Sequence, residues 1–150
     1  MGELKKKDKK FTYSTTVSWD KEKKGFLCSI GKQTVLIGTP PEFKGHEGVW
    51  TPEDLFVASV NACIKTTFLH YAQRNNFEFL SYDSEAEGVL EKVENKFIIS
   101  KIKVKPKIIV SSDSQVEKAK ELIELAKKNC FISNSIASEV TIYPEIRVGP

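Results

Sequence analysis

The sequence predicts an α+β domain with two main helices and the element order β-β-β-α-β-β-α-β. Three observations predict it. Residues 55–69 are apolar or small on most helical faces and contain no helix breaker. Residues 116–126 place apolar side chains every three or four positions, the period of an amphipathic helix. The remaining segments are rich in β-branched and aromatic residues and are separated by turn residues, as in strands.

Three strands are predicted before the first helix. Residues 11–19 are aromatic and β-branched, which favours a strand. Two short apolar runs, 26–30 and 34–37, lie on either side of Gly31 and Lys32 and resemble a hairpin. Residues 38–50 contain two prolines and several glycines, so we expect a functional or covering loop there rather than a hinge alone.

The first helix is predicted to begin at Thr51 and Pro52. Threonine is a good N-cap, and proline suits the first helical position. Glu53 and Asp54 follow, and acidic groups stabilise the positive end of the helix dipole. Nothing interrupts the helix up to residue 74. A helix that is apolar on nearly every face is typical of the centre of a core or of an interface.

Two long strands are predicted within residues 79–110, with a turn near residues 94–96. Ser112 or Asp113 is expected to cap the second helix, and two lysines at 127–128 complement its C-terminal end. A last strand is predicted over 140–148.

Charge and hydropathy limit the function classes. Residues 1–10 hold five lysines against two acids, a local charge of +3, which equals the net charge of the whole chain. We therefore expect a flexible lysine-rich leader at 1–10 and a single, electrically balanced domain at 11–150. This balance disfavours a nucleic-acid partner. The sequence has neither an apolar segment long enough to span a bilayer nor a signal-peptide pattern, so we expect a cytoplasmic protein without membrane association.

Three cysteines are the candidate reactive groups: Cys28, Cys63 and Cys130. An odd number argues against a disulfide framework, and the absence of a C-x-x-C pair argues against a zinc site. A reactive cysteine needs a neighbouring cation, helix N-terminus or donor to lower its pKa. The residues alone leave open whether each cysteine is reactive or a small buried hydrophobe.

Two segments carry a resemblance to a known family. Residues 51–63, TPEDLFVASVNAC, combine a proline-glutamate pair, an apolar helix and a cysteine ten positions after the glutamate. Residues 130–136, CFISNSI, place a cysteine after the next helix and before a Ser-Asn turn. Both are similar to the signatures of the OsmC/Ohr family (osmotically inducible protein C and organic hydroperoxide resistance proteins), and the likeness covers residues 11–148.

The resemblance implies an OsmC-like fold and a peroxiredoxin-like antioxidant enzyme that works without metal or flavin. The Cys63 thiolate would attack an organic hydroperoxide, Cys130 would resolve the sulfenic acid as a disulfide, and a dithiol, usually lipoyl-type, would reduce it. Glu53 matches a functional glutamate. The family also implies an intertwined homodimer with long central helices and two sites at the interface.

One position departs from the family pattern. Members place an arginine in the loop after the first strand, where it stabilises the thiolate, but residues 20–25 contain none. Lys21, Lys23 and Lys24 are the candidate cations there, although lysine lacks the bidentate fork of arginine. The alternative is a slow or non-catalytic relative that binds a small apolar ligand in the dimer cleft. Cys28, His46 and His70 are expected to have structural or surface roles.

Overall fold

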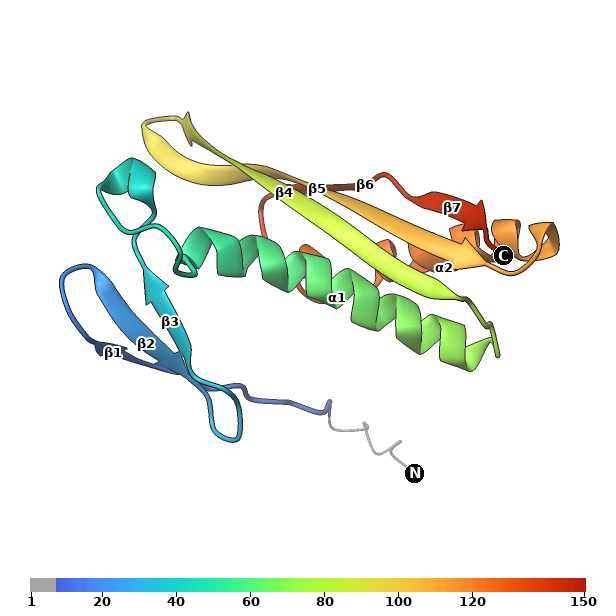
Figure 1. Ribbon diagram of the computed structural model, residues 1–150, viewed down its shortest axis with the longest axis horizontal. Coiled ribbons are helices and arrows are strands. Elements are labelled where there is room, and N and C mark those ends of the chain that lie inside the picture. Colours follow the sequence, from blue (N-terminus) through green and yellow to red (C-terminus); the bar gives the residue numbers. More distant parts are fainter. Residues whose placement is uncertain (1–7) are drawn as a thin grey trace, which may run out of the picture. The chain divides into compact units, whose positions relative to one another are not determined.

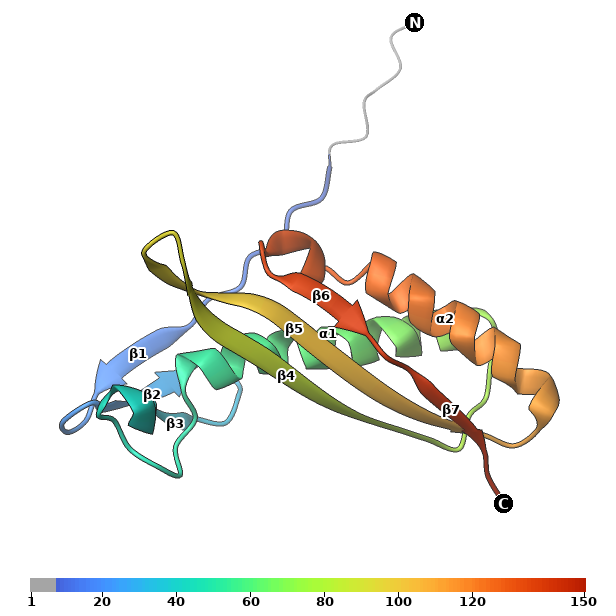
Figure 2. The ribbon, with the colours of Figure 1, turned by 90° about the horizontal axis from the view of Figure 1, so that it is seen from above.

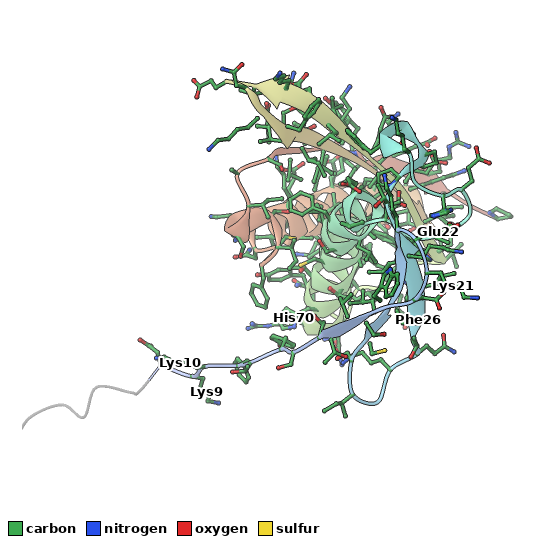
Figure 3. All side chains as sticks on the ribbon, turned by 90° about the vertical axis from the view of Figure 1, so that its left-hand side faces the viewer. Lys9, Lys10, Lys21, Glu22, Phe26 and His70 are labelled. Atoms are coloured by element: carbon green, nitrogen blue, oxygen red, sulfur yellow. The ribbon has the colours of Figure 1, made fainter. Side chains whose placement is uncertain are left out.

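The computed structural model describes residues 8–150, which form two compact units, one ending at Pro52 and the other beginning at Glu53. Most of the leader predicted for 1–10 lies outside the described residues. Its last two lysines, Lys9 and Lys10, are exposed and precede the first strand (Figure 3). The single domain expected over 11–150 stays a prediction.

The first unit is a three-stranded antiparallel sheet. Its strands β1 (Thr16–Trp19), β2 (Lys24–Cys28) and β3 (Val35–Gly38) are paired in the order β1-β2-β3 (Figure 1). The strand predicted from residue 11 is wrong in its first half, because the ladder with β2 ends where Thr16 opposes Cys28. The hairpin between β2 and β3 is confirmed.

The loop predicted between β3 and the first helix is confirmed. It contains one short 3-10 helix, η1 (Pro41–Phe43), and Gly38 N–H donates to the Trp50 carbonyl across its ends. This bond and a bridge between Ile37 and Trp50 join the two ends of the loop, so the loop leaves the sheet and returns to it at the same place.

The second unit is built on a longer sheet and two helices. Helix α1 (Pro52–Arg74) is followed by the strands β4 (Ser81–Val93) and β5 (Lys96–Val110). After η2 (Asp113–Gln115), helix α2 (Val116–Lys128) leads through η3 (Ser133–Ser135) to β6 (Glu139–Ile142) and β7 (Glu145–Val148). Both helices lie against the same face of the sheet (Figures 1 and 2).

The long hairpin forms as predicted. Glu94 and Asn95 both have positive φ, 47° and 65°, as a two-residue hairpin turn matched to the strand twist requires. Beyond it, the last predicted strand is two strands rather than one. Both β6 and β7 pair in parallel with β5, and Tyr143 and Pro144 separate them. A proline has no N–H to give to the ladder, so the strand is interrupted there.

The two faces of the hairpin differ in chemistry. Alternate residues of β5 from Ile102 to Val110 are buried against the helices. The intervening lysines point to the other face, where Lys103 opposes Glu87 and Lys105 opposes Glu85 across the strands. Opposite charges at directly paired positions stabilise the register of the two strands. The apolar core lies on the other face of the sheet, against the helices.

The core of the second unit comes from one stripe on each helix and from β5. In α1, Val60, Ile64, Phe68 and Ala72 are buried at i, i+4 spacing, while Leu69 is 38% exposed. Helix α1 therefore keeps apolar surface outside the core of its own chain. In α2 the buried stripe matches the prediction and consists of Ala119, Leu122, Ile123 and Ala126.

The start of α2 also matches the prediction. Ser112 and Gln115 form a reciprocal capping box, which leads through η2 into the helix. Within residues 8–150, no helix has the combination of length and apolarity needed to cross a membrane.

Candidate thiol site

Cys63 lies in the middle of α1 on the border of the buried stripe. Val60 and Ile64, one turn before it and next to it, are fully buried, and Cys63 packs against the core while staying partly accessible. Residues one turn apart on a helix are neighbours, so Thr67 lies beside it. The Thr67 hydroxyl is 2.7 Å from the Cys63 carbonyl oxygen and 3.9 Å from the Cys63 sulfur.

Cys130 follows the C-terminal end of α2 and is fully buried. Asn129 ends the helix, and its side-chain amide donates to the Leu125 carbonyl at 3.0 Å. A tight turn then surrounds the sulfur: Ser133 N–H donates to Cys130 Sγ at 3.4 Å, and Asn134 N–H donates to the Cys130 carbonyl at 3.0 Å. The turn therefore fixes both the backbone and the sulfur of Cys130.

The fold brings these two cysteines together, since each side chain acts on the pKa of the other. Both are free thiols. Sequence reasoning paired them only through the resemblance. The physical cause of their proximity is the packing of the turn after α2 against the middle of α1.

The environment separates the pKa values of the two thiols. Burial acts to raise the pKa of Cys63, but the Ile132 N–H, the Cys130 thiol, Thr67 and the Phe131 N–H oppose it, and the net direction is downward. The pKa of Cys130 is raised by its burial and by the neighbouring Cys63, against the stabilising effect of Ser133. Cys63 is thus the more acidic thiol of the pair, and Cys130 is the less acidic one.

Thr67 lowers the pKa of Cys63 less than the Ile132 N–H and the Cys130 thiol do. Its single proton serves one acceptor at a time, and the 2.7 Å distance favours the Cys63 carbonyl over the sulfur at 3.9 Å. The turn after Cys130 is therefore the main source of thiolate stabilisation. Sequence reasoning missed Thr67, Ile132 and Ser133, although a hydroxyl four residues after a helical cysteine was a readable signal.

Glu53 lies in the first turn of α1, ten positions before Cys63, which is about 15 Å along a helix axis. Its Oε2 atom is buried and has no hydrogen-bond partner among residues 8–150. The helix thus separates the Glu53 and Cys63 side chains of one chain, and the functional role expected for Glu53 stays a prediction.

The candidate cations belong to the first unit, in and beside the turn between β1 and β2 (Figure 3). Lys23 Nζ donates to the Phe43 carbonyl at 3.1 Å, while Lys21 is exposed. The role expected for Lys21, Lys23 and Lys24 stays a prediction. In the same turn Glu22 Oε2 lies 3.1 Å from His46 Nε2.

The remaining candidates lie apart from the thiol pair in the chain. Cys28 Sγ lies 3.5 Å from the Thr34 hydroxyl at the end of the small sheet. His70 is exposed on α1 and stacks edge-on against Tyr71. Among residues 8–150, no group of three His, Cys, Asp or Glu side chains is arranged to hold a metal ion.

Comparison with known proteins identifies the family. The model of the family described as "OsmC-like protein" matches residues 45–145, which include both cysteines of the site. This chain belongs to the OsmC-like protein family. The curated relatives of this OsmC-like chain include the peroxiredoxin OsmC of Escherichia coli, 29% identical over 129 residues, which covers 83% of this chain and 89% of the relative.

A second relative is an uncharacterized protein of Methanocaldococcus jannaschii. It is 33% identical over 91 residues, which cover 60% of this chain and 46% of that protein. This match therefore spans less than half of the length of that relative.

Solved structures confirm the predicted α+β OsmC-like fold. An OsmC-like protein of unknown function from Vibrio cholerae superimposes with a TM-score of 0.83 at 24% identity, covering 90% of this chain and 99% of its own. An organic hydroperoxide resistance protein from Elizabethkingia anophelis gives a TM-score of 0.75 at 19% identity, covering 95% and 100%.

Proposed function

We propose that this OsmC-like chain is a thiol peroxidase that reduces organic hydroperoxides, with Cys63 as the attacking thiolate and Cys130 as the resolving thiol. The observation that carries the proposal is the downward shift of the Cys63 pKa beside a second, neutral cysteine. Its relative, the E. coli peroxiredoxin OsmC, supports the same class of chemistry.

The first step is an attack of the Cys63 thiolate on a peroxide oxygen. The sulfur gives an electron pair to form an S–O bond, the O–O bond breaks, and the leaving alkoxide takes a proton to become an alcohol. Cys63 is left as a sulfenic acid. Cys63 suits this step because it is partly accessible and its pKa is lowered, whereas Cys130 is fully buried.

Resolution then follows from the same geometry. Burial raises the pKa of Cys130, and the negative charge of a Cys63 thiolate raises it further. Oxidation converts Cys63 into a neutral sulfenic acid, and that repulsion disappears. Cys130 loses its proton more easily and attacks the Cys63 sulfur, so that a disulfide forms and water leaves. An external dithiol, lipoyl-type by family resemblance, returns both sulfurs to thiols.

An apolar substrate fits the surroundings of the pair. Phe131, directly after Cys130, is 79% exposed, and Cys63 packs against an apolar core. An alkyl or aryl hydroperoxide gains contact with such surfaces, whereas hydrogen peroxide has no apolar part to bury.

We further propose that the working form is a cytoplasmic homodimer. Helix α1 keeps apolar surface outside the core of its own chain, as Leu69 illustrates. A second chain is the occupant that would cover it. Because α1 separates Glu53 from Cys63 within one chain, a shared site would let Glu53 and a lysine from residues 21–24 act across the interface.

A peroxide titration with the sulfur state read by intact mass tests the proposal. Stoichiometric cumene hydroperoxide should convert the wild type to a single Cys63–Cys130 disulfide. Cys63→Ser should consume no peroxide, Cys130→Ser should complete one turnover and stop at a sulfenic acid, and the control Cys28→Ser should behave as wild type. Unmodified Cys63 after this treatment would overturn the proposal, and an apolar ligand retained in native mass spectra would then favour a binding function.

A further inference from the structure

Ser133 is a polar neighbour of Cys130 that the proposed cycle has not used. Its backbone N–H donates to Cys130 Sγ at 3.4 Å. Its hydroxyl oxygen is buried and makes no hydrogen bond with any residue in the described part of the chain, 8–150. A buried hydroxyl without a partner costs stability, so its retention beside a reacting sulfur calls for a reason.

The protonation state of Cys130 gives a reason for the unpaired Ser133 hydroxyl. In the reduced protein Cys130 is a neutral thiol, and neutral sulfur is a weak acceptor. As a thiolate, the same sulfur accepts strong, charge-assisted hydrogen bonds. The Ser133 hydroxyl lies close enough to the sulfur to act against the upward shift of the Cys130 pKa. Ser133 thus offers two donors, N–H and O–H, to a charge that is present only transiently.

We infer that Ser133 stabilises Cys130 as the leaving thiolate when the Cys63–Cys130 disulfide is reduced. This inference rests on the proposed function, because it concerns the second half of that cycle. It also fixes the direction of the exchange. The reductant attacks Cys63, since Cys63 is the partly accessible sulfur and Cys130 is fully buried.

The step balances as a thiol–disulfide exchange. One thiolate of the dithiol gives its electron pair to Cys63 Sγ, the bond between Cys63 and Cys130 breaks, and that electron pair leaves on Cys130. The Ser133 N–H and O–H groups hold the new thiolate until it takes a proton. The second thiol of the dithiol then attacks the mixed disulfide and releases Cys63.

The test measures disulfide reduction without any peroxide. In a Cys28→Ser background, diamide forms the Cys63–Cys130 disulfide, and excess dithiothreitol then reduces it. Samples are quenched at intervals, and the fraction of disulfide that remains is measured by intact mass. Ser133→Ala should slow reduction about three- to tenfold, because one charge-assisted hydrogen bond to the leaving group is lost. Ser133→Thr keeps a hydroxyl and should restore most of the rate.

Ser135→Ala is the matched control, since Ser135 lies in the same turn but its hydroxyl donates to the Phe131 carbonyl at 2.6 Å. It should reduce at the wild-type rate. A second measurement follows thiolate absorbance against pH in Cys28→Ser/Cys63→Ser, where Ser133→Ala should move the titration of Cys130 to higher pH.

The inference is overturned if Ser133→Ala matches the wild type in both measurements, or if Ser133→Thr is as slow as Ser133→Ala. Failure of diamide to link Cys63 and Cys130 overturns it as well. Since no peroxide is used, an inactive peroxidase leaves these outcomes unchanged, and an active peroxidase does not guarantee them.

Discussion

The Cys130 thiol lies next to the Cys63 sulfur and acts to lower the pKa of Cys63, while burial and the Cys63 sulfur raise the pKa of Cys130. In the proposed cycle, this one buried thiol would therefore serve two purposes at different times. It would first stabilise the attacking Cys63 thiolate and would later resolve the Cys63 sulfenic acid.

The first prediction concerns the pH dependence of Cys63 alkylation in a Cys28→Ser background. Because the pKa of Cys63 is lowered, its reaction with iodoacetamide should have its midpoint below that of a free cysteine. The reactive form is present above that pKa and is lost as the pH falls through it. Cys130→Ala removes a donor and should move the midpoint upward.

Cys130→Ser is the control for this measurement, since its hydroxyl still donates to Cys63. It should keep the midpoint closer to the wild-type value than Cys130→Ala does. Identical profiles for the two variants would show that the Cys130 side chain does not stabilise the Cys63 thiolate.

A second prediction follows from the close approach of β4 to α1. A Cβ atom at Gly88 would lie 2.5 Å from Val57 Cγ2 and 3.4 Å from Ile99 Cγ2. Gly88→Ala should therefore force the helix and strand apart and lower the free energy of unfolding by about 1–3 kcal/mol, measured by urea denaturation. Gly88→Ala should cost less unfolding free energy in a Val57→Ala background than in the wild type, because the clashing methyl group is then absent. A strictly additive double variant would refute the clash.

A third prediction concerns the polar contact between the same two elements. Ser84 on β4 donates to Asn61 Oδ1 at 2.6 Å, and Asn61 Nδ2 donates back to the Ser84 carbonyl at 3.5 Å. The contact is partly buried, so Ser84→Ala should cost about 1–2 kcal/mol by leaving Asn61 Oδ1 unpaired. A double-mutant cycle with Asn61→Ala should give a coupling of at least about 0.5 kcal/mol. Zero coupling would mean that the two side chains act independently.

The helices and the long hairpin were predictable because their signals are local. Pro52 starts α1, the spacing of apolar residues marks the buried stripe of α2, and Glu94 and Asn95 make the hairpin turn. Pairing partners are not local. The first half of the strand predicted over 11–19 has the right residue types but lies beyond the ladder with β2, and Pro144 interrupts a run that otherwise reads as one strand.

The site shows the same division. Cys63 and Cys130 were found through a resemblance, since nothing in their spacing shows that α2 returns the chain to the middle of α1. The donors that set the Cys63 pKa include backbone N–H groups of Ile132 and Phe131. Every residue except proline has such a group, so its role depends on position and leaves no mark in the sequence.

The last prediction tests whether the Tyr82 hydroxyl has a hydrogen-bond partner. Its hydroxyl is buried without a hydrogen-bond partner among residues 8–150. Burial, partly offset by Ser84, raises its pKa from the ordinary 10.0 to about 12. Because the pKa of Tyr82 is higher in the folded state, its contribution to stability is fully present below pH 10. This contribution declines as the pH rises from 10 through about 12. Tyr82→Phe should remove that part of the decline, seen as a smaller difference in unfolding free energy between pH 10 and pH 12.

At neutral pH, Tyr82→Phe should be neutral or stabilising by up to about 1 kcal/mol, because an unpaired polar group leaves the core. The ring itself stays packed against Phe68, 5.3 Å away between centroids. A loss of more than about 1 kcal/mol would instead mean that the hydroxyl has a partner. If that loss appeared only at protein concentrations where the chain is dimeric, the partner would be a second chain, and Tyr82 would mark the face of the unit that the dimer covers.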